Sequence, residues 1–210
     1  QAAYASVFRR DLFAGQVHIV TGGGSGIGRC VAHELCSLGA HVVLVGRKLD
    51  KLERVQAEIA GSGGQAEVEA FDIRDEPAVQ SGMARIVERH RRVHGLVNNA
   101  GGQFPSLLAD ISKRGFEAVL ATNLTGGFLM AREVFVRSMR EHGGAIVNMV
   151  ADMWNGMPGM GHSGAARAGM VNLTKTAAFE WASCAVRVNA VAPGYIASNG
   201  LDQYPEAMRG

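Results

Sequence analysis

The sequence predicts an α/β protein whose doubly wound parallel sheet lies between two layers of helices, a three-layer arrangement. Short apolar segments alternate with segments of helical periodicity, and the connections between them are short. Residues 41–45 are apolar without interruption, as expected for a strand that is covered on both faces. With no linker, repeat or low-complexity tract, we predict a single domain over residues 1–210.

The first half of the chain contains four predicted strands and three predicted helices. Val31, Leu35 and Leu38 recur at helical spacing, and Gly39 ends that helix. The glycine-rich residues 61–64 end the next helix in the same way. In order, we predict a strand at 17–21, a helix at 29–38, a strand at 41–45, a helix at 49–60, a strand at 66–71, a helix at 76–91 and a strand at 94–98.

The second half repeats the alternation with longer helices. We predict a helix at 115–139, a strand at 145–150, a helix at 163–181 and a strand at 186–191. One long irregular stretch, 151–162, precedes the second of these helices. Irregular loops of this length in a compact domain are usually functional, so we expect part of the site there.

Composition excludes several classes of protein. Hydrophobic residues make up 47% of the chain and charged residues 19%, enough for a substantial core. The net charge is +2 and no block of five basic residues occurs, which argues against binding to nucleic acid or an anionic membrane. No apolar run is long enough for a membrane span or a signal peptide, so we expect a cytoplasmic protein. The three cysteines, Cys30, Cys36 and Cys184, lack metal-ligand spacing, which predicts buried thiols, a reducing compartment and no metal.

A glycine-rich turn separates the first predicted strand from the first predicted helix. Backbone amides and the dipole of a helix N-terminus stabilise a pyrophosphate there, and side chains would obstruct it. The strand–turn–helix context is the one that a dinucleotide site of the Rossmann type requires. A tight turn without a ligand is the alternative. The residues predicted to bind the cofactor here are Gly22, Ser25, Gly26, Ile27 and Gly28.

The end of the second strand predicts which nicotinamide dinucleotide is bound. Many NAD-binding chains carry a carboxylate there for the ribose hydroxyls. This chain has Gly46, followed by Arg47 and Lys48. Arg47 can bind a 2′-phosphate through two parallel hydrogen bonds, which favours NADP(H), with NAD(H) as the second choice. The alternative is a solvated pair of cations that opens a helix.

Together these motifs resemble the short-chain dehydrogenase/reductase family from about Gly15 to Ser198. The resemblance rests on the glycine turn, Asp72-Ile73, the run 98–101 and Asn123, and on Pro193-Gly194 after the last strand. It implies that Asp72 and Ile73 lie near adenine. It further implies that Asn99, Ala100 and Gly101 lie beside the cofactor, with Pro193, Gly194 and Ile196 near nicotinamide.

The chain departs from the family's catalytic set of Asn, Ser, Tyr and Lys. Asn123 is retained, but Ala151 stands at the serine position, Ser163 at the tyrosine position and Arg167 at the lysine position. Ser163 cannot replace the tyrosine as an acid because its hydroxyl is far less acidic. Arg167 lies one helical turn beyond Ser163, where a fixed cation can still hold the ribose. We therefore predict an enzyme with an atypical active site.

Two branches of the family carry similar segments. The run 101–104 with 162–169 resembles peroxisomal-type trans-2-enoyl-CoA reductases, except that Val171 replaces a tyrosine on the helix. The runs 151–154 and 159–163 are similar to bacterial proteins of citronellol and citronellal oxidation. Both branches imply an apolar substrate and a role in lipid or terpenoid metabolism.

Three residues are candidates for the missing proton donor. Asp152 follows the fifth strand, eleven residues before Ser163, the spacing at which dienoyl-CoA reductases carry an acidic tyrosine. A desolvated Asp152 would act as acid or base; the alternatives are a cap or a salt bridge to Arg167. His162 suits proton exchange, although a structural role is the favoured interpretation. Ser163 would order water or bind a substrate carbonyl, or cap the helix.

Several methionines crowd the same region. Met149 and Met170 are expected to fill the core, whereas Met153, Met157 and Met160, with Trp154, suit equally the core or the wall of an apolar substrate site. Family members usually continue with a substrate-covering segment and a seventh strand, but only residues 199–210 follow Ser198 here.

The predicted function is transfer of hydride between NADP(H) and an apolar enoyl, carbonyl or alcohol substrate. The catalytic residues are expected to be Asn123, Asp152, Ser163 and Arg167. The rival is a dinucleotide-binding sensor or scaffold without turnover. The small residues of the two long helices, together with the family's habit, predict a homodimer or homotetramer; these residues are Gly126, Gly127, Ala165, Ala166, Ala168 and Gly169.

Overall fold

A computed structural model describes residues 7–194 and residue 196, and it contains a parallel sheet of six strands in the order β3-β2-β1-β4-β5-β6. The predicted α/β fold is confirmed. Expectations that fall on residues 1–6, on Tyr195 and on 197–210 lie outside the described residues. The strands are β1 (Val17–Thr21), β2 (His41–Gly46), β3 (Gln65–Ala70), β4 (Gly95–Asn98), β5 (Gly144–Met149) and β6 (Val186–Val191).

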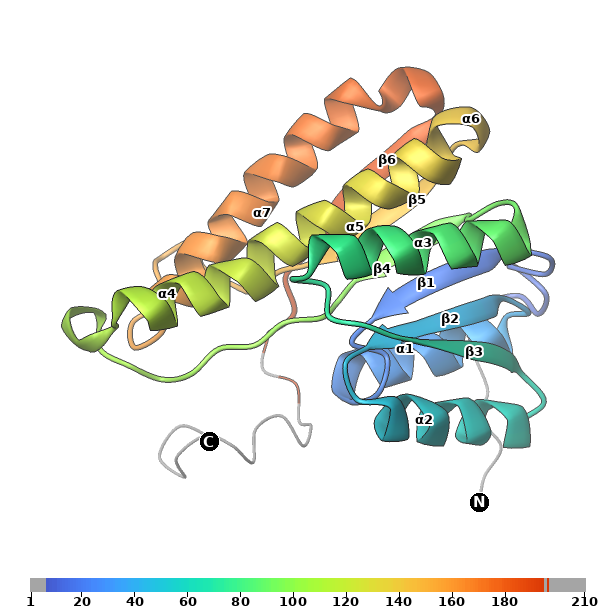
Figure 1. The fold of residues 1–210 in the computed structure, drawn as a ribbon, viewed down its shortest axis with the longest axis horizontal. Coiled ribbons are helices and arrows are strands. Elements are labelled where there is room, and N and C mark those ends of the chain that lie inside the picture. Colours follow the sequence, from blue (N-terminus) through green and yellow to red (C-terminus); the bar gives the residue numbers. More distant parts are fainter. Residues whose placement is uncertain (1–6, 195, 197–210) are drawn as a thin grey trace.

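Helices cover both faces of this sheet, and Figure 1 shows the three layers. Two helices pack on one face: α1 (Gly26–Ser37) and α2 (Leu49–Gly61). The other face carries α3 (Glu76–His90), α5 (Gly126–Val134) and α7 (Gly161–Glu180). The remaining helical segments are η1 (Leu108–Asp110), α4 (Lys113–Leu120), η2 (Ala121–Thr125), η3 (Phe135–Met139), α6 (Arg140–His142) and η4 (Ala182–Cys184).

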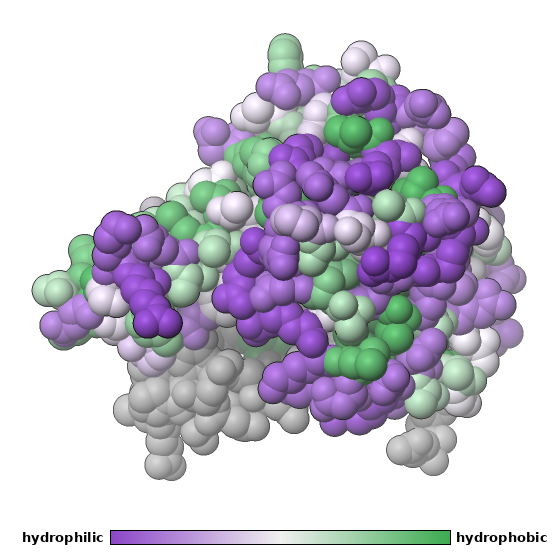
Figure 2. Space-filling model, viewed as in Figure 1, coloured by the Kyte–Doolittle hydropathy of each residue, from purple (hydrophilic) through white to green (hydrophobic). Residues whose placement is uncertain are grey.

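Alternating side chains of β2 explain why the sheet needs both layers. Val42 and Leu44 are wholly buried against α1 and α2, whereas Val43 and Val45 are wholly buried on the opposite face, beneath α3 and α5. Burying each such side chain stabilises the fold by about 1.5–3 kcal/mol. Hydrophilic residues predominate on the face of the molecule shown in Figure 2, and apolar residues form separate patches on it.

The helix predicted at 115–139 is longer and less regular than expected. A continuous helical path runs through α4, η2, α5, η3 and α6, and η2 and η3 are π-helical. A π-turn inserts an extra residue into a helix and often marks a functional position. Asn123 lies in the first π-turn and is buried.

Most of the small residues of the long helices pack against other parts of the same chain. They therefore do not form the contact surface between copies that the sequence predicted. A Cβ at Gly126 would meet Ile73, one at Gly127 would meet Met170, and one at Gly169 would meet Leu124. Ala166 is wholly buried as well. Only the residues Ala165 and Ala168 of that set are exposed.

The thiols also differ from expectation. Cys36 is buried, but Cys184 is half-buried and Cys30 is exposed; all three are unbonded to one another. Cys30 lies on the outer surface of α1, where its helical position points it away from the sheet. Within the described residues, no helix combines the length and apolar character needed to cross a bilayer.

Two histidines at the N-terminal end of the sheet lie in surroundings that favour the neutral imidazole, His18 and His94. His18 is buried beside Gly95, and burial, aided by the charge of His94, lowers its pKa to about 4. His94 accepts a hydrogen bond from the Val17 amide at 3.0 Å through Nδ1. Burial, with the charges of Arg92 and His142, lowers the pKa of His94 as well.

We therefore expect the free energy of unfolding to fall as the pH drops from 7.5 to 5. The unfolded chain binds a proton at His18 near pH 6.5 and the folded chain only near pH 4, so stability is lost across that window. For His18 alone the loss at pH 5 is about 2 kcal/mol. Urea unfolding at both pH values measures it. His18→Leu should flatten the dependence, and an equal stability of the wild-type protein at pH 7.5 and 5 would contradict the expectation.

Candidate active site

The glycine turn after β1 is packed so closely that side chains are excluded. A Cβ at Gly28 would collide with the carbonyl oxygen of Gly22 and would lie 2.5 Å from Asn99 Nδ2. Gly22 has φ +67°, and a Cβ there would lie 2.9 Å from the same Asn99 nitrogen. Asn99 Nδ2 donates to the carbonyl of Thr21 at 3.0 Å, which fixes the turn against the end of β4.

The N-terminus of α1 is left open for an anion. Ser25 is the N-cap, and its side chain makes no capping hydrogen bond. The first amides of a helix have no partner within the helix, and together with the helix dipole they attract negative charge. A cavity of about 640 Å³ opens here and is lined by five residues predicted to bind the cofactor, namely Ser25, Gly26, Ile27, Pro193 and Ile196. Gly194 lies in open space beside Pro193.

Thr21 and the run after β4 form a second fixed part of this sheet edge. The amides of Asn99 and Ala100 both donate to Thr21 Oγ1, each at 3.0 Å. Thr21 is buried at the end of β1. The backbone from Asn99 to Gly101 is therefore held beside the glycine turn, where the family resemblance implies that the cofactor lies.

Of three predicted cofactor-binding residues beside β2 and β3, Arg47 and Asp72 lie near each other, whereas Ile73 lies in the core. Arg47 is exposed, and its charge helps to keep the pKa of Asp72 below its usual range. The main cause is Arg74, which donates to Asp72 Oδ2 at 2.6 Å. Sequence reasoning missed Arg74, although its position two residues beyond Asp72 was a signal. Ile73 is buried in the core against Gly126.

Arg167 extends from α7 to the ends of β4 and β5. One guanidinium nitrogen, Nη1, donates to the carbonyl of Met149 at 2.5 Å, and a Cβ at Gly101 would lie 2.6 Å from Nη2. Arg167 Nε is buried and has no hydrogen-bond partner among the described residues. Burial lowers the pKa of Arg167 to about 10, so the side chain is still a cation at neutral pH.

Asn123 holds the backbone next to Arg167. Its Nδ2 donates to the Gly102 carbonyl at 3.0 Å, and its Oδ1 accepts from the Gly102 amide at 2.9 Å. Asn123 Oδ1 would also lie 3.2 Å from a Cβ at Gly101. The π-turn of the long helix thus fixes the segment 101–102 in front of the guanidinium.

Ser163 is buried within α7 and is not the cap of that helix, since Met160 occupies the N-cap position. Its hydroxyl donates to Gln103 Oε1 at 2.7 Å. Gln103 lies in the run 101–104 that carries the family resemblance, but the sequence did not predict this contact. His162 is wholly buried in a T-shaped ring contact with Phe104, and its Nδ1 accepts from the Ser163 amide at 2.9 Å. His162 Nε2 has no partner among the described residues.

Asp152 lies on the loop after β5 and is exposed. Among the described contacts, none is a salt bridge from Asp152 to Arg167 or a cap on a helix; Arg167 binds the Met149 carbonyl instead. The desolvation expected of Asp152 is therefore absent among the described residues, and a bound substrate or cofactor would have to supply it.

Apolar side chains gather around the loop 151–160. Ser106 pairs with Met160 in a short parallel bridge, which places the segment after Phe104 beside this loop. Met153 and Met170 are buried, and Met149, Met157 and Met160 are half-buried. Four large apolar side chains in these two segments are exposed: Phe104, Leu107, Leu108 and Trp154. The two segments together present an apolar surface next to Ser163.

The fold and the glycine turn define a dinucleotide-binding α/β protein whose ligand would lie at the carboxyl edge of the sheet. Residues 16–209 match the short chain dehydrogenase family. The chain therefore belongs to this family of oxidoreductases, as the sequence motifs predicted.

Known proteins similar to this chain include a citronellol dehydrogenase and 2,4-dienoyl-CoA reductases, and also a 3-oxoacyl-[acyl-carrier-protein] reductase and a glucose 1-dehydrogenase. The citronellol catabolism dehydrogenase AtuB of Pseudomonas aeruginosa PAO1 has 62% identity and a TM-score of 0.90, covering 98% of this chain and 82% of that one. The peroxisomal 2,4-dienoyl-CoA reductase of Pongo abelii is 33% identical over 92% of this chain and 67% of its own length. A probable 2,4-dienoyl-CoA reductase of Bacillus subtilis (strain 168) is 35% identical over 87% of this chain and 73% of its own.

Proposed function

We propose that this chain is an NADP(H)-dependent oxidoreductase acting on an apolar enoyl, carbonyl or alcohol substrate, such as an enoyl-CoA ester or a terpenoid alcohol or aldehyde. The observation that carries the proposal is the position of the Arg167 cation beside Gly101, at the same sheet edge as the glycine turn. The similarity to a citronellol dehydrogenase and to dienoyl-CoA reductases supports the substrate class. When bound, the nicotinamide cofactor supplies or accepts the hydride.

The residues of the chain would bind and orient the reactants. The excluded side chains at Gly22 and Gly28 leave room for a diphosphate at the start of α1. Arg167 would hold the nicotinamide ribose, since its buried Nε has no partner within residues 7–194 or at residue 196 and its side chain is a cation at neutral pH. Asn123 would keep the segment 101–102 in place, and the Ser163–Gln103 pair would orient the substrate carbonyl.

Asp152 is the proposed proton donor. Its exposed position leaves it accessible from the apolar surface of Trp154 and Phe104, and a bound apolar substrate would remove water from it. Removing water from a carboxyl group disfavours its charged form, so a bound substrate would favour the protonated acid that can donate. The alternative donor is a water molecule held in place by Ser163. The serine hydroxyl itself donates its proton to Gln103.

The deciding experiment is a screen of NADPH and NADH oxidation against enoyl-CoA esters and terpenoid aldehydes, with the reverse reaction on terpenoid alcohols. Turnover of an apolar substrate is the expected result, and Asp152→Asn should keep its affinity for NADPH while losing rate. NADPH binding without hydride transfer to any of these acceptors would favour the sensor or scaffold and would contradict the proposal.

Arg47 is expected to select the phosphorylated cofactor. Arg47→Ala should weaken NADPH binding about tenfold, because an exposed charge-assisted contact to phosphate contributes roughly 1.4 kcal/mol, and should leave NADH binding unchanged. Titration calorimetry with both cofactors measures this. Lys48→Ala is the matched control, since it removes the adjacent charge without the guanidinium geometry. Equal losses for NADPH and NADH would rule out a 2′-phosphate contact.

We also propose that the chain assembles as a homodimer or homotetramer through its long helices. Large apolar side chains are exposed on α5, η3 and α7, namely Phe128, Val136 and Phe179. Burying them between copies would stabilise an assembly. Light scattering is expected to give a mass of two or four chains, and Phe179→Lys should reduce it. A monomeric wild-type protein at micromolar concentration would refute the assembly.

A further inference from the structure

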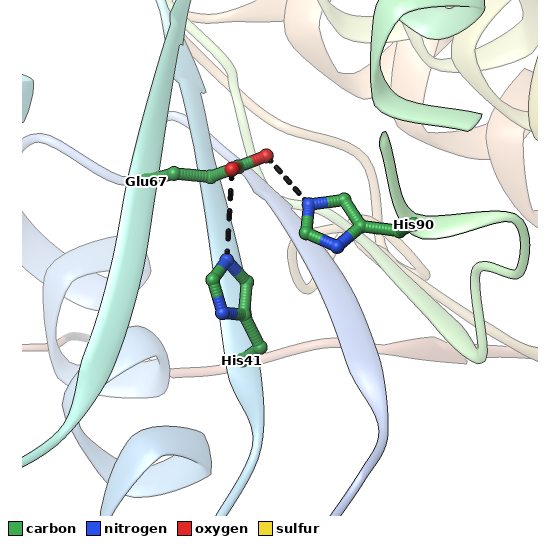
Figure 3. Close-up of side chains that lie close together, drawn as sticks. All are labelled: His41, Glu67 and His90. Atoms are coloured by element: carbon green, nitrogen blue, oxygen red, sulfur yellow. Dashed lines mark hydrogen bonds and ion pairs between the residues drawn. The ribbon is translucent and has the colours of Figure 1, made fainter. Parts of the chain in front are cut away.

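Three potential metal ligands converge at the end of the sheet opposite the candidate active site. His41 is the first residue of β2, Glu67 lies in β3, and His90 is the last residue of α3. Figure 3 shows both imidazoles directed at the Glu67 carboxylate. His90 Nε2 lies 2.8 Å from Glu67 Oε1, and His41 Nε2 lies 3.7 Å from Glu67 Oε2. The three ligand atoms all lie within 4.8 Å of one another.

The imidazole of His41 has a ring nitrogen that lacks a hydrogen bond within the described part of the chain. Its Nε2 atom is buried and has no hydrogen-bond partner among the described residues. A buried polar atom without a partner is costly and calls for an explanation, such as a missing ion or water. The side chains of His41, Glu67 and His90 are 29%, 23% and 16% exposed, so an ion could reach them from solvent.

The donor set and its spacing fit a transition-metal ion. Two imidazoles and one carboxylate form a common zinc-binding set that leaves a fourth position for water. Ligands about 2.0–2.1 Å from a tetrahedral ion lie roughly 3.3 Å apart. The two histidines approach different oxygens of Glu67, at 2.8 Å for His90 and 3.7 Å for His41, and the three ligand atoms lie within 4.8 Å of one another. Side-chain rotations that draw these atoms together would complete the geometry. We propose that His41, Glu67 and His90 bind one divalent transition-metal ion, Zn²⁺ in the first place.

Neighbouring charges limit the affinity of this site. Arg89 donates to Glu67 Oε1 at 3.0 Å and also to Glu69 Oε1 at 2.5 Å, and Arg85 donates to Glu69 Oε2 at 2.7 Å. The charges of the two carboxylates are already neutralised by the two guanidiniums. A divalent ion would therefore add net positive charge to the cluster, which opposes its binding. Arg89 would keep Glu69 as its partner when Glu67 binds the ion. We therefore expect a dissociation constant in the micromolar range rather than the tighter binding of closed structural zinc sites.

A metal ion at this site would link an edge strand of the sheet to the neighbouring elements. β3 is one of the two edge strands of the described sheet, and the ion would join it to β2 and to the end of α3. These residues lie near the N-terminal ends of the strands, whereas the glycine turn and Arg167 lie at the carboxyl ends. Metal binding should thus stabilise the protein without changing its affinity for NADPH, and its test is independent of the proposed function.

Titration of the full-length protein, free of any histidine tag, with Zn²⁺ is the primary test. We expect one site per chain by calorimetry and a rise in Tm, because an ion that binds only the folded state stabilises it. His41→Gln and His90→Gln should each weaken binding about 10- to 100-fold, since even partners outside the first ligand sphere cost that much. His33→Gln is the matched control: His33 lies 3.3 Å from Glu58 in a pair of similar burial but with a single histidine.

Long-range ¹H–¹⁵N NMR of the wild-type protein keeps the proposal testable if a variant fails to fold. Zn²⁺ should shift the Nε2 signals of two histidines, and Co²⁺ should give the visible absorption of a tetrahedral site. Absence of binding at sub-millimolar Zn²⁺ would overturn the proposal. Binding that is weakened equally by His33→Gln, or that leaves the His41 and His90 signals unmoved, would overturn it as well and would leave an ion-pair cluster as the role of these residues.

Discussion

Gly28→Ala is expected to abolish measurable binding of nicotinamide dinucleotides, with a loss of about 100-fold or more. A methyl group at this position would collide with the Gly22 carbonyl oxygen and would lie 2.5 Å from Asn99 Nδ2. Neither neighbour can move freely, because Gly22 is backbone and the Asn99 amide is bound to the Thr21 carbonyl. Overpacking of this kind costs about 1–3 kcal/mol, and here the strain falls on the turn that would hold the diphosphate.

Calorimetry with NADPH, supported by circular dichroism, measures the effect. Gly61→Ala is the matched control, since Gly61 ends α2 and a Cβ there meets nothing within 4 Å. The control should bind NADPH as the wild-type protein does. A folded Gly28→Ala protein with wild-type affinity would show that the turn does not contact the cofactor.

Most of the fold was predictable because the sheet is buried on both faces. The strands at 17–21 and 186–191 begin and end where the apolar pattern places them. The helix after the glycine turn starts at Gly26, three residues before the predicted start at Arg29, because its first turn is made of Gly26, Ile27 and Gly28 and so carries little helical periodicity. The positive φ of Gly39, +90°, confirms the predicted end of that helix.

The π-turns of the long helix could not be predicted from periodicity. A π-turn shifts the helical register by one residue, and a pattern of 3.6 residues per turn does not reveal where the shift falls. Its consequence is local: Asn123 reaches both the amide and the carbonyl of Gly102. The family motif identified the residue, whereas its partner depends on tertiary packing.

Contacts between distant segments account for the rest of what sequence reasoning missed. Ser163 and Gln103 are sixty residues apart and meet only because α7 lies beside the segment after β4. His41, Glu67 and His90 follow no metal-binding spacing, since parallel strands and a crossover helix bring them together. The proposed metal site therefore departs from the expectation, based on cysteine spacing, that the chain holds no metal.

Arg167→Met is expected to lower kcat/KM with the proposed substrates by about 100-fold. The guanidinium is held between the Met149 carbonyl and Gly101, and burial lowers its pKa to about 10 without removing its charge at neutral pH. Methionine fills a similar volume but lacks the cation that would hold the ribose. Losing one buried charge-assisted contact of this kind costs about 3 kcal/mol, or two orders of magnitude in rate constant.

Arg167→Lys distinguishes a charge requirement from a packing requirement. Lysine keeps the cation and occupies the position at which the family carries lysine, so kcat/KM should stay within about tenfold of the wild-type value. Steady-state kinetics and NADPH titration on all three proteins separate affinity from turnover. If Arg167→Met retained wild-type kcat/KM, or if the lysine variant lost as much as the methionine variant, the cation would not be the group that holds the ribose.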